Sequence, residues 1–196
     1  MNAEAPARRM TRAEYCAFER DTTIKHEYIA GDVFAMTGGT LEHSRLAGKI
    51  IQQLSNRLEG GPCEVLTSDA RVRIESVDAD VYPDVSVVCG PPETSEADDH
   101  ALLNPTLIVE VLSLGTEAYD RGLKASYYRQ IPSLQAYLLV AQDRPHLELQ
   151  LRDAKGRWVI VEVGPGERLT IPALEVELDV NAIYRDAIPA RSASSR

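Results

Sequence analysis

The sequence predicts a mixed α/β (α+β) fold, in which helices flank a central mixed β-sheet and an extra β-hairpin lies toward each end of the chain. Residues 41–58 repeat leucine and isoleucine at four-residue steps, which is the stripe of an amphipathic helix. Residues 85–89 and 106–112 are almost continuously apolar, as central strands are. Residues 26–36 and 146–163 each combine two short apolar segments with a turn sequence, which predicts the two hairpins.

The first elements are a short helix and the N-terminal hairpin. Thr11 and Glu14 have the spacing of a capping box, which predicts a helix that runs to about Arg20. In the hairpin, residues 30–32 (Ala-Gly-Asp) provide the turn between two short strands. The long helix that follows ends at residues 60–62 (Gly-Gly-Pro).

Polar and apolar residues alternate between Glu64 and Glu75, which predicts one half-exposed strand. Arg71 and Arg73 share one face of it, where they could contact phosphates, but a solvated edge strand is the favoured interpretation. Residues 90–105 have the composition of an acidic loop.

The C-terminal half continues with a helix and further strands. Residues 116–129 suit a helix, and residues 131–132 (Ile-Pro) end it. Residues 134–140 suit a strand, after which the second hairpin follows.

Length and composition indicate a single globular domain. With 196 residues, of which 44% are hydrophobic and 26% charged, the chain can close one core, which we place at residues 11–186. Residues 1–10 and 187–196 are small, polar or proline-containing, so we expect flexible tails. The chain has no run of about 18 apolar residues and no apolar segment at its start, which predicts a cytoplasmic protein without a membrane segment.

The net charge of -9 and the pI near 5.0 argue against a protein that holds nucleic acid by its overall charge. A nucleic-acid enzyme of this composition would need a local basic groove, or carboxylates screened by a metal ion that they bind. Cys16, Cys63 and Cys89 are odd in number and far apart, without histidines at metal spacing. We interpret them as reduced structural thiols, not as a disulfide framework or a zinc site.

Asp84 and Glu110 are the main candidates for a functional site. Each belongs to an apolar strand segment, where an ionised carboxylate costs several kcal/mol unless it is paired, solvated or bound to a cation. Alternation puts Glu110 on one strand face with Ile108 and Leu112, and Asp84 lies at the mouth of its own strand. If the strands are neighbours, both carboxylates can reach one divalent cation such as Mg²⁺, with Lys124 nearby.

Such a set of side chains suits phosphodiester hydrolysis, because a metal ion polarises the phosphoryl oxygen while a lysine stabilises added negative charge or orients water. Each residue also has a structural interpretation. Asp84 follows a proline and can be a turn residue, and Lys124 can form a surface ion pair with Asp120 at i, i+4. Glu110 is the hardest to explain structurally, because valines flank it in its strand.

Several short segments, spread over about residues 11 to 185, follow one another in a defined order and spacing. They are His26-Glu-Tyr-Ile-Ala-Gly31, Leu41-Glu-His43, Tyr82-Pro-Asp84, Ile108-Val-Glu-Val-Leu-Ser113, Asp120-Arg-Gly-Leu-Lys124 with Tyr128, and Ile131-Pro-Ser-Leu-Gln-Ala-Tyr137. In this order and spacing, the sequence resembles the Uma family of restriction-endonuclease-like proteins, within the PD-(D/E)xK nuclease superfamily. The resemblance implies a restriction-endonuclease-like core and a site that binds Mg²⁺ or Mn²⁺.

The resemblance also assigns roles to residues. The acid of the PD motif and the acid of the next strand bind the metal ion in that superfamily, which maps to Asp84 and Glu110, with Val111 as a third metal-binding position. The superfamily places an assisting lysine two positions after the second acid, where this chain has Leu112. The role therefore maps to Lys124 on the following helix.

A second departure concerns the start of that helix. The family tends to have Ser-Pro-Ser-Thr after the strand, whereas residues 113–116 are Ser-Leu-Gly-Thr. The direction in which Lys124 points therefore depends on how the helix begins.

His43, Glu42 and Glu27 are secondary candidates. The resembling family carries a histidine at the position of His43, which could contact the substrate or transfer protons, or could be a hydrogen-bonded helix residue. Glu42 could be an additional acid near the metal ion, but a charge that complements the start of the helix is favoured. For Glu27, an exposed strand glutamate is the default.

Two functions are consistent with these observations. The first is a metal-dependent endonuclease that hydrolyses DNA phosphodiester bonds, with Asp84, Glu110, Lys124 and His43 as catalytic residues. The alternative is a catalytically inactive module of the same fold that binds a protein or nucleic-acid partner. Because duplex cleavage requires two strand cuts, a homodimer is compatible with the first function.

Overall fold

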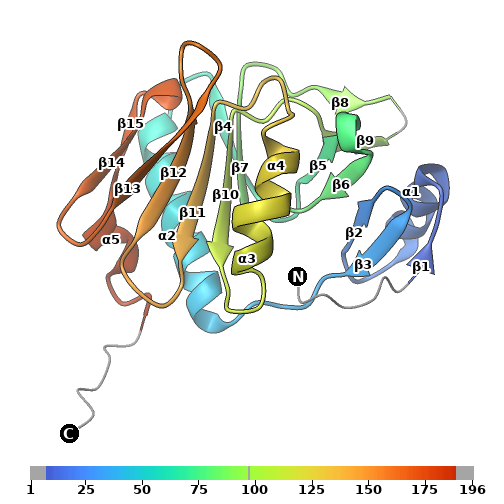
Figure 1. The fold of residues 1–196 in the computed structure, drawn as a ribbon, viewed down its shortest axis with the longest axis horizontal. Helices are drawn as coiled ribbons and strands as arrows, with labels where there is room; N and C mark the ends of the chain where they lie inside the picture. Colours follow the sequence, from blue (N-terminus) through green and yellow to red (C-terminus); the bar gives the residue numbers. More distant parts are fainter. Residues whose placement is uncertain (1–7, 97, 189–196) are drawn as a thin grey trace, which may run out of the picture.

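The computed structural model describes residues 8–96 and 98–188. Its framework is a six-stranded and a seven-stranded β-sheet, a two-stranded sheet and the helices packed around them (Figure 1). The expected flexible tails lie mostly outside the described residues, but Arg8 and Arg9 form strand β1 and Ala187 is 1% exposed. Within the described ranges, no helix has the length and apolar character needed to span a membrane.

The mixed sheet predicted from the sequence is the six-stranded one. Its strand order is β13-β12-β11-β10-β7-β4, in which β10 and β11 are parallel and the other pairs are antiparallel. The two apolar runs, β7 and β10, are neighbours near its centre, as their composition indicated. The strands are β4 (Cys63–Thr67), β7 (Val85–Cys89), β10 (Leu107–Leu112), β11 (Ala136–Ala141), β12 (Leu147–Arg152) and β13 (Trp158–Val163).

Helices cover both faces of this sheet (Figure 1). Helix α2 packs its stripe of leucine and isoleucine against one face, and a second helical segment covers the other. That second segment contains a π-helical turn between two short α-helices. The helical elements are α2 (Leu41–Leu58), α3 (Glu117–Tyr119), the π-helical turn η2 (Asp120–Lys124) and α4 (Ala125–Tyr128).

Strand β10 divides its side chains between the two cores, and the alternation predicted for it is confirmed. Leu107 and Val111 pack with α2, whereas Ile108 and Leu112 pack with α4 on the opposite face. Glu110 shares this second face. Its carboxylate therefore points toward the helical segment that contains η2.

The seven-stranded sheet has the order β1-β3-β2-β6-β5-β9-β8 and contains the predicted N-terminal hairpin. The hairpin turns at Ala30 and Gly31, whose φ angles of 47° and 99° suit a tight two-residue turn. Helix α1 begins with the predicted capping box, in which Thr11 and Glu14 each accept a hydrogen bond from the other's backbone N–H. The elements are β1 (Arg8–Arg9), α1 (Arg12–Asp21), β2 (His26–Ile29), β3 (Asp32–Ala35), β5 (Arg71–Ile74), the 3₁₀ turn η1 (Glu75–Val77), β6 (Ala79–Val81), β8 (Thr94–Ser95) and β9 (Asp98–Leu102).

The residues after the second hairpin add a small sheet and a helix that the sequence analysis did not anticipate. Apolar side chains of this unit join the core beneath α2. Gln53 of α2 donates to the backbone carbonyl of Asp179 at 3.2 Å and accepts from its N–H at 3.0 Å, which fixes the unit to the helix. The elements are β14 (Arg168–Ile171), the 3₁₀ turn η3 (Pro172–Leu174), β15 (Val176–Asp179) and α5 (Val180–Tyr184).

Two predicted segments are wrong. Residues 64–75 form two strands, β4 and β5, which belong to different sheets because a turn at residues 68–70 separates them. Arg71 is 4% exposed and lies in an internal strand of its sheet, so it does not belong to a solvated edge. The predicted acidic loop of residues 90–105 contains β8 and β9, which complete that sheet.

The interpretation of the cysteines as reduced thiols is wrong for two of them. Cys63 on β4 and Cys89 on β7 form a disulfide, while Cys16 is free and buried. The two strands pair antiparallel with these residues directly opposite each other, and their Cα atoms are 4.0 Å apart. Residues 26 positions apart in sequence are thus neighbours across one pair of strands.

Candidate active site

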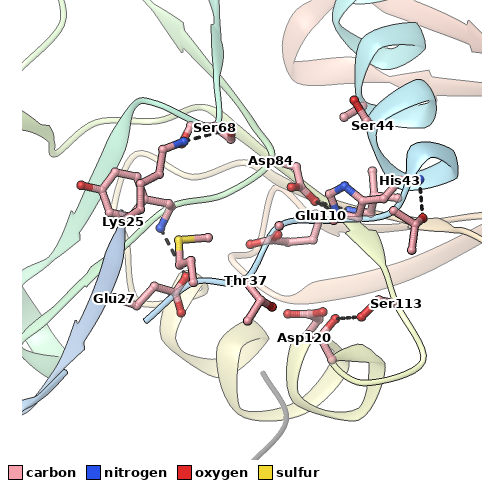
Figure 2. A pocket seen from close by; sticks show the side chains of 18 of the residues that line it. Lys25, Glu27, Thr37, His43, Ser44, Ser68, Asp84, Glu110, Ser113 and Asp120 are labelled. Carbon is pink, nitrogen blue, oxygen red and sulfur yellow. Dashed lines mark hydrogen bonds and ion pairs between the residues drawn. The ribbon is translucent and has the colours of Figure 1, made fainter. Parts of the chain in front are cut away.

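A cavity of about 1000 Å³ lies at one end of the β7–β10 pair and collects the candidate residues (Figure 2). Its walls come from the N-terminal hairpin, the segment between β3 and α2, the first turns of α2, the residues after β10, and η2. His43, Asp84, Glu110, Val111 and Lys124 all line it. The structure therefore brings together all the catalytic and metal-binding candidates named from the sequence.

Asp84 is fixed to the strand that carries Glu110. Because β7 and β10 pair antiparallel, Asp84 and Glu110 come together at one end of the pair. Oδ2 of Asp84 accepts a hydrogen bond from the backbone N–H of Val111 at 2.7 Å. The same oxygen lies 3.1 Å from Nε2 of His43.

Glu110 is 5% exposed and is held through one of its oxygens. Oε1 accepts a hydrogen bond from the Tyr128 hydroxyl at 2.7 Å and lies 2.7 Å from Nζ of Lys124. Burial raises the pKa of Glu110 to about 8; Lys124 opposes the rise and Asp84 adds to it. A buried carboxylate with a raised pKa in a cleft is typical of functional sites.

Lys124 is a buried cation, so its interpretation as a surface ion-pair residue is wrong. It is 6% exposed, and its Nζ lies 2.7 Å from Glu110, 3.3 Å from Glu27 and 4.0 Å from Asp120. Burial by itself lowers the pKa of Lys124, but Glu110 and Glu27 more than offset this and hold it well above its usual value. Lys124 belongs to the π-helical turn η2, and such turns are frequent at functional sites.

Glu27 is also buried, so the default of an exposed strand glutamate is wrong. It is 2% exposed on β2, and its Oε1 lies 3.3 Å from Lys124 and accepts a hydrogen bond from the Tyr82 N–H at 3.3 Å. Within the described residues, its Oε2 is buried without a hydrogen-bond partner. Glu27 therefore connects Lys124 to the segment that leads into Asp84.

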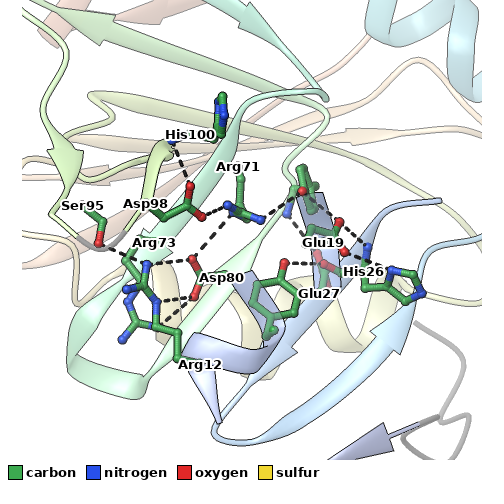
Figure 3. Close-up of polar contacts among 12 residues, drawn as sticks. Arg12, Glu19, His26, Glu27, Arg71, Arg73, Asp80, Ser95, Asp98 and His100 are labelled. Atoms are coloured by element: carbon green, nitrogen blue, oxygen red, sulfur yellow. Dashed lines mark hydrogen bonds and ion pairs between the residues drawn. The ribbon is translucent and has the colours of Figure 1, made fainter. Parts of the chain in front are cut away.

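A buried polar network holds the backbone around Glu27 (Figure 3). The Tyr82 hydroxyl donates to Glu19 at 3.0 Å, and Glu19 lies 3.0 Å from Nδ1 of His26, the residue before Glu27. Arg71 pairs with Asp98 in the same network. Because it is buried and paired, Arg71 is not available for contacts with phosphates.

His43 is positioned by the first turn of α2. Thr40 caps the helix by accepting a hydrogen bond from the His43 N–H at 3.2 Å, and the imidazole reaches Asp84, whose hydrogen bond raises the pKa of His43. A Cβ atom at Gly39 would lie 2.8 Å from Nδ1 of His43, so this ring position requires a glycine there. Glu42 does not line the cavity, and backbone hydrogen bonding at the helix start lowers its pKa, in agreement with its favoured structural interpretation.

Asp84 and Glu110 fit a divalent metal ion that keeps part of its coordination for other ligands. Within the described residues, neither Oδ1 of Asp84 nor Oε2 of Glu110 accepts a hydrogen bond from the protein. Val111 can add only its backbone carbonyl, because its N–H is donated to Asp84. In the described part of the chain, no cluster of three or more His, Cys, Asp or Glu side chains suits a metal ion, so water or substrate oxygens would complete the shell, as is usual for Mg²⁺.

The balance of charge in the cavity also fits a bound cation. Four buried or half-buried carboxylates line it, of which Asp84 and Asp120 both raise the pKa of Glu110. Burial raises the pKa of Asp120 as well. A divalent cation among these groups would favour their ionised forms and relieve the repulsion between them. The four carboxylates belong to Glu27, Asp84, Glu110 and Asp120.

The sequence analysis missed two tyrosines of this site. Tyr128, which belongs to the segments of the resemblance but received no role from the sequence, is fully buried, and its hydroxyl donates a hydrogen bond to Glu110. Tyr119 lines the cavity with a buried hydroxyl that has no partner among the described residues. Tyr128 follows Lys124 at i+4, so helical spacing could have placed both on one face.

Comparison with known proteins identifies a family and a fold. The sequence profile of the Uma2 family, described as "Putative restriction endonuclease", matches residues 12–182. Two uncharacterized proteins of Synechocystis sp. are similar to this chain. One is 36% identical over 181 residues, which cover 92% of this chain and 94% of the relative. The other is 32% identical over 163 residues, which cover 83% of this chain and 92% of the relative.

Among solved structures, a similar fold is found in a protein described as a putative nuclease belonging to DUF820 from Anabaena variabilis, which superposes with a TM-score of 0.68. The match covers 88% of this chain and 96% of that chain at 15% sequence identity. At this identity, the likeness shows a shared fold, and the predicted mixed sheet flanked by helices is confirmed.

Proposed function

Because this chain belongs to the Uma2 family, we propose that it is a Mg²⁺- or Mn²⁺-dependent endonuclease that hydrolyses DNA phosphodiester bonds. The observation that carries the proposal is the convergence of Asp84, Glu110 and Lys124 on one cavity. Asp84 is bonded to the residue after Glu110 at 2.7 Å, and Lys124 lies 2.7 Å from Glu110 itself. The restriction-endonuclease-like fold and the family description agree with this chemistry.

The carboxylates of Asp84 and Glu110 would hold the metal ion, with the carbonyl of Val111 as a third ligand. When bound, the ion supplies polarisation of a phosphoryl oxygen and a more acidic water. His43 orients Asp84 from one side, and the Tyr128 hydroxyl orients Glu110 from the other. These contacts engage one oxygen of each carboxylate and leave the second oxygen for the metal ion.

Lys124 supplies a fixed positive charge beside the reacting phosphate. Its ammonium is held between Glu110 and Glu27, so little reorganisation is needed when negative charge develops on the phosphoryl group. Its N–H groups can also orient the attacking water. Both roles require a protonated amine, and the raised pKa of Lys124 provides one at neutral pH.

Nicking of supercoiled plasmid DNA with Mg²⁺ or Mn²⁺ tests this function. We expect the wild-type protein to nick the plasmid and Glu110→Gln to lose at least about 100-fold in rate, as the loss of one electrostatic group at a reacting centre typically does. Glu148→Gln is the matched control, because Glu148 is also a buried glutamate of the six-stranded sheet but does not line the cavity. Full activity in Glu110→Gln would contradict the mechanism.

A second candidate function is a catalytically inactive module that binds a protein or nucleic-acid partner. One observation favours it: His43 pairs with Asp84 and Lys124 pairs with Glu110, so each of the two carboxylates already has a partner within the protein. Calorimetry with Mn²⁺ separates the two functions. Failure to detect binding at millimolar metal, with DNA present, would support the module.

The proposed endonuclease would cut a duplex as a homodimer. Each chain contributes one pair of Asp84 and Glu110, and cleavage of both strands requires two such sites. Comparison of plasmid linearisation with nicking measures whether two sites act together.

A further inference from the structure

The cavity of the candidate active site contains a second lysine, which the proposed mechanism does not use. Among the described residues that line the cavity, Lys25 and Lys124 are the only lysines, and no arginine joins them. Lys124 is buried between carboxylates, whereas the side chain of Lys25 is 37% exposed. Because the chain has a net charge of -9, a polyanion that binds here needs local cations. Lys25 is the lysine of this cavity that such a ligand can reach from solvent.

Strand pairing places Lys25 beside the metal-binding candidates. Thr67, the last residue of β4, is the partner of Val85, the residue after Asp84. Ser68 therefore follows β4 at the same end of the strand pair as Asp84. Nζ of Lys25 is bound to this serine, because it donates to the Ser68 carbonyl oxygen at 2.8 Å and to Oγ at 3.4 Å (Figure 2). The ammonium thus lies one strand away from the carboxylate of Asp84.

The ammonium of Lys25 and the hydroxyl of Ser68 both keep a donor for a ligand. An ammonium has three N–H donors. One binds the Ser68 carbonyl, and a second binds Oδ1 of Asp69 at 2.6 Å. The third has only the long contact to Ser68 Oγ, and the hydroxyl proton of Ser68 has no acceptor among the described residues. Two donors, one of them charged, therefore suit a phosphate oxygen.

The ion pair between Lys25 and Asp69 does not prevent this contact. The side chain of Asp69 is 83% exposed, and an ion pair at such exposure contributes little to stability because water and salt screen it. A phosphodiester group of DNA has the same sign of charge, and the counterions that DNA releases favour its binding. A phosphate can therefore replace Asp69 as the partner of Lys25, and Asp69 competes with it.

We propose that Lys25 and Ser68 form a phosphate-binding site for the DNA strand, next to the phosphate that Asp84 and Glu110 would cleave. The inference rests on the proposed function, since it takes DNA as the substrate, and it adds a contact outside the reacting centre. Contacts to phosphates fix the position of a protein on nucleic acid without reading its sequence. Lys25 is thus a positioning residue, and its loss should weaken the binding of DNA of any sequence.

The salt dependence of DNA binding tests the role of Lys25. Fluorescence anisotropy of a labelled DNA duplex measures the affinity, with a chelator present to prevent cleavage. Lys25→Met should weaken binding about tenfold at about 0.1 M salt, and it should lower the slope of log affinity against log salt by about one, as the loss of one phosphate contact does. Lys155→Met is the matched control, because it removes the same charge from an exposed turn outside the cavity and should keep the wild-type slope.

Replacement of Asp69 tests the competition with phosphate. Asp69→Asn should tighten DNA binding about threefold, because a phosphate then no longer displaces a carboxylate from Lys25. Asp99→Asn is the matched control, because the side chain of Asp99 is 84% exposed and pairs with His100, not with a lysine of the cavity. If Lys25 served only to hold the turn at residues 68–70, Asp69→Asn would not tighten binding. Circular dichroism checks that each variant is folded.

The outcomes separate the phosphate site from the nuclease activity. Equal affinity and slope in Lys25→Met and Lys155→Met would overturn the phosphate site, even for a protein that nicks plasmid DNA. The site would also be overturned if Asp69→Asn bound DNA no more tightly than Asp99→Asn, or if the wild type bound no DNA. Binding that depends on Lys25, in a protein that does not nick plasmid DNA, would support the site and contradict the endonuclease.

Discussion

The ammonium nitrogen of Lys124 lies 2.7 Å from Oε1 of Glu110, and both side chains are almost fully buried. Glu27 holds the same ammonium from the N-terminal hairpin at 3.3 Å. The three side chains thus join β10, η2 and β2 through a buried ammonium that lies between two carboxyl groups. Removal of one partner leaves a buried charge without compensation, so the substitution of each side chain should have a measurable effect.

Replacement of Lys124 by methionine should destabilise the protein. Without metal and above pH 8, where Glu110 is ionised, we expect the free energy of unfolding to fall by about 3 kcal/mol, because Glu110 and Glu27 lose their cation. Saturating Mn²⁺ should recover part of this loss. Urea denaturation with a chelator or with Mn²⁺ measures both, and Lys155→Met, at an exposed turn residue, serves as control. Equal stability of Lys124→Met and wild type would show that the ion pair is absent in solution.

Replacement of Glu27 by glutamine should slow cleavage and leave metal binding intact. We expect a rate loss of about 100-fold, the cost of a displaced catalytic group, because Lys124 loses one of its two close carboxylates. Steady-state kinetics and Mn²⁺ calorimetry measure the two effects, with Glu64→Gln on an exposed part of β4 as control. Loss of metal affinity in Glu27→Gln would instead make Glu27 a metal ligand.

Metal binding should become tighter as the pH rises toward 8. Burial raises the pKa of Glu110 to about 8, so below that pH the carboxyl group must release a proton before it binds the ion. The apparent affinity should rise by up to about tenfold per pH unit and then level off above the pKa. Calorimetry in buffers of different ionisation enthalpy measures the released proton. An affinity that does not change with pH would contradict a protonated Glu110.

Reduction of the Cys63–Cys89 disulfide should lower the free energy of unfolding by about 3 kcal/mol, the entropic effect expected for a closed loop of this length. Urea denaturation with and without a reducing agent measures the difference. Cys63→Ser should match the reduced protein and should not respond to the reducing agent. If oxidised and reduced protein unfold at the same urea concentration, the cross-link contributes nothing.

The sequence predicted those parts of the fold that local patterns determine. The α2 stripe, the apolar runs of β7 and β10, and the turn at residues 30–32 each follow from spacing or turn chemistry within a few residues. The division of residues 64–75 between two sheets could not be predicted, because the alternation of polar and apolar residues continues across the turn at residues 68–70. Tertiary pairing decided which sheet each part joined.

The part of the candidate site that lies on strands was predicted from the sequence. Asp84 and Glu110 stood out because a carboxylate in an apolar strand is costly. The burial of Glu27 and of Lys124 could not be predicted in the same way, because each is buried only with a partner that is distant in sequence. The Cys63–Cys89 disulfide has the same origin, since it depends on the pairing of β4 with β7.

In the proposed mechanism, Asp84 and Glu110 hold one divalent metal ion together. Calorimetric titration with Mn²⁺ tests this shared site on the wild type, Asp84→Asn, Glu110→Gln and the control Glu148→Gln. We predict one ion per chain for the wild type and the control, and at least about a 100-fold loss of affinity in each of the other two variants. Wild-type affinity in either Asp84→Asn or Glu110→Gln would contradict a shared site.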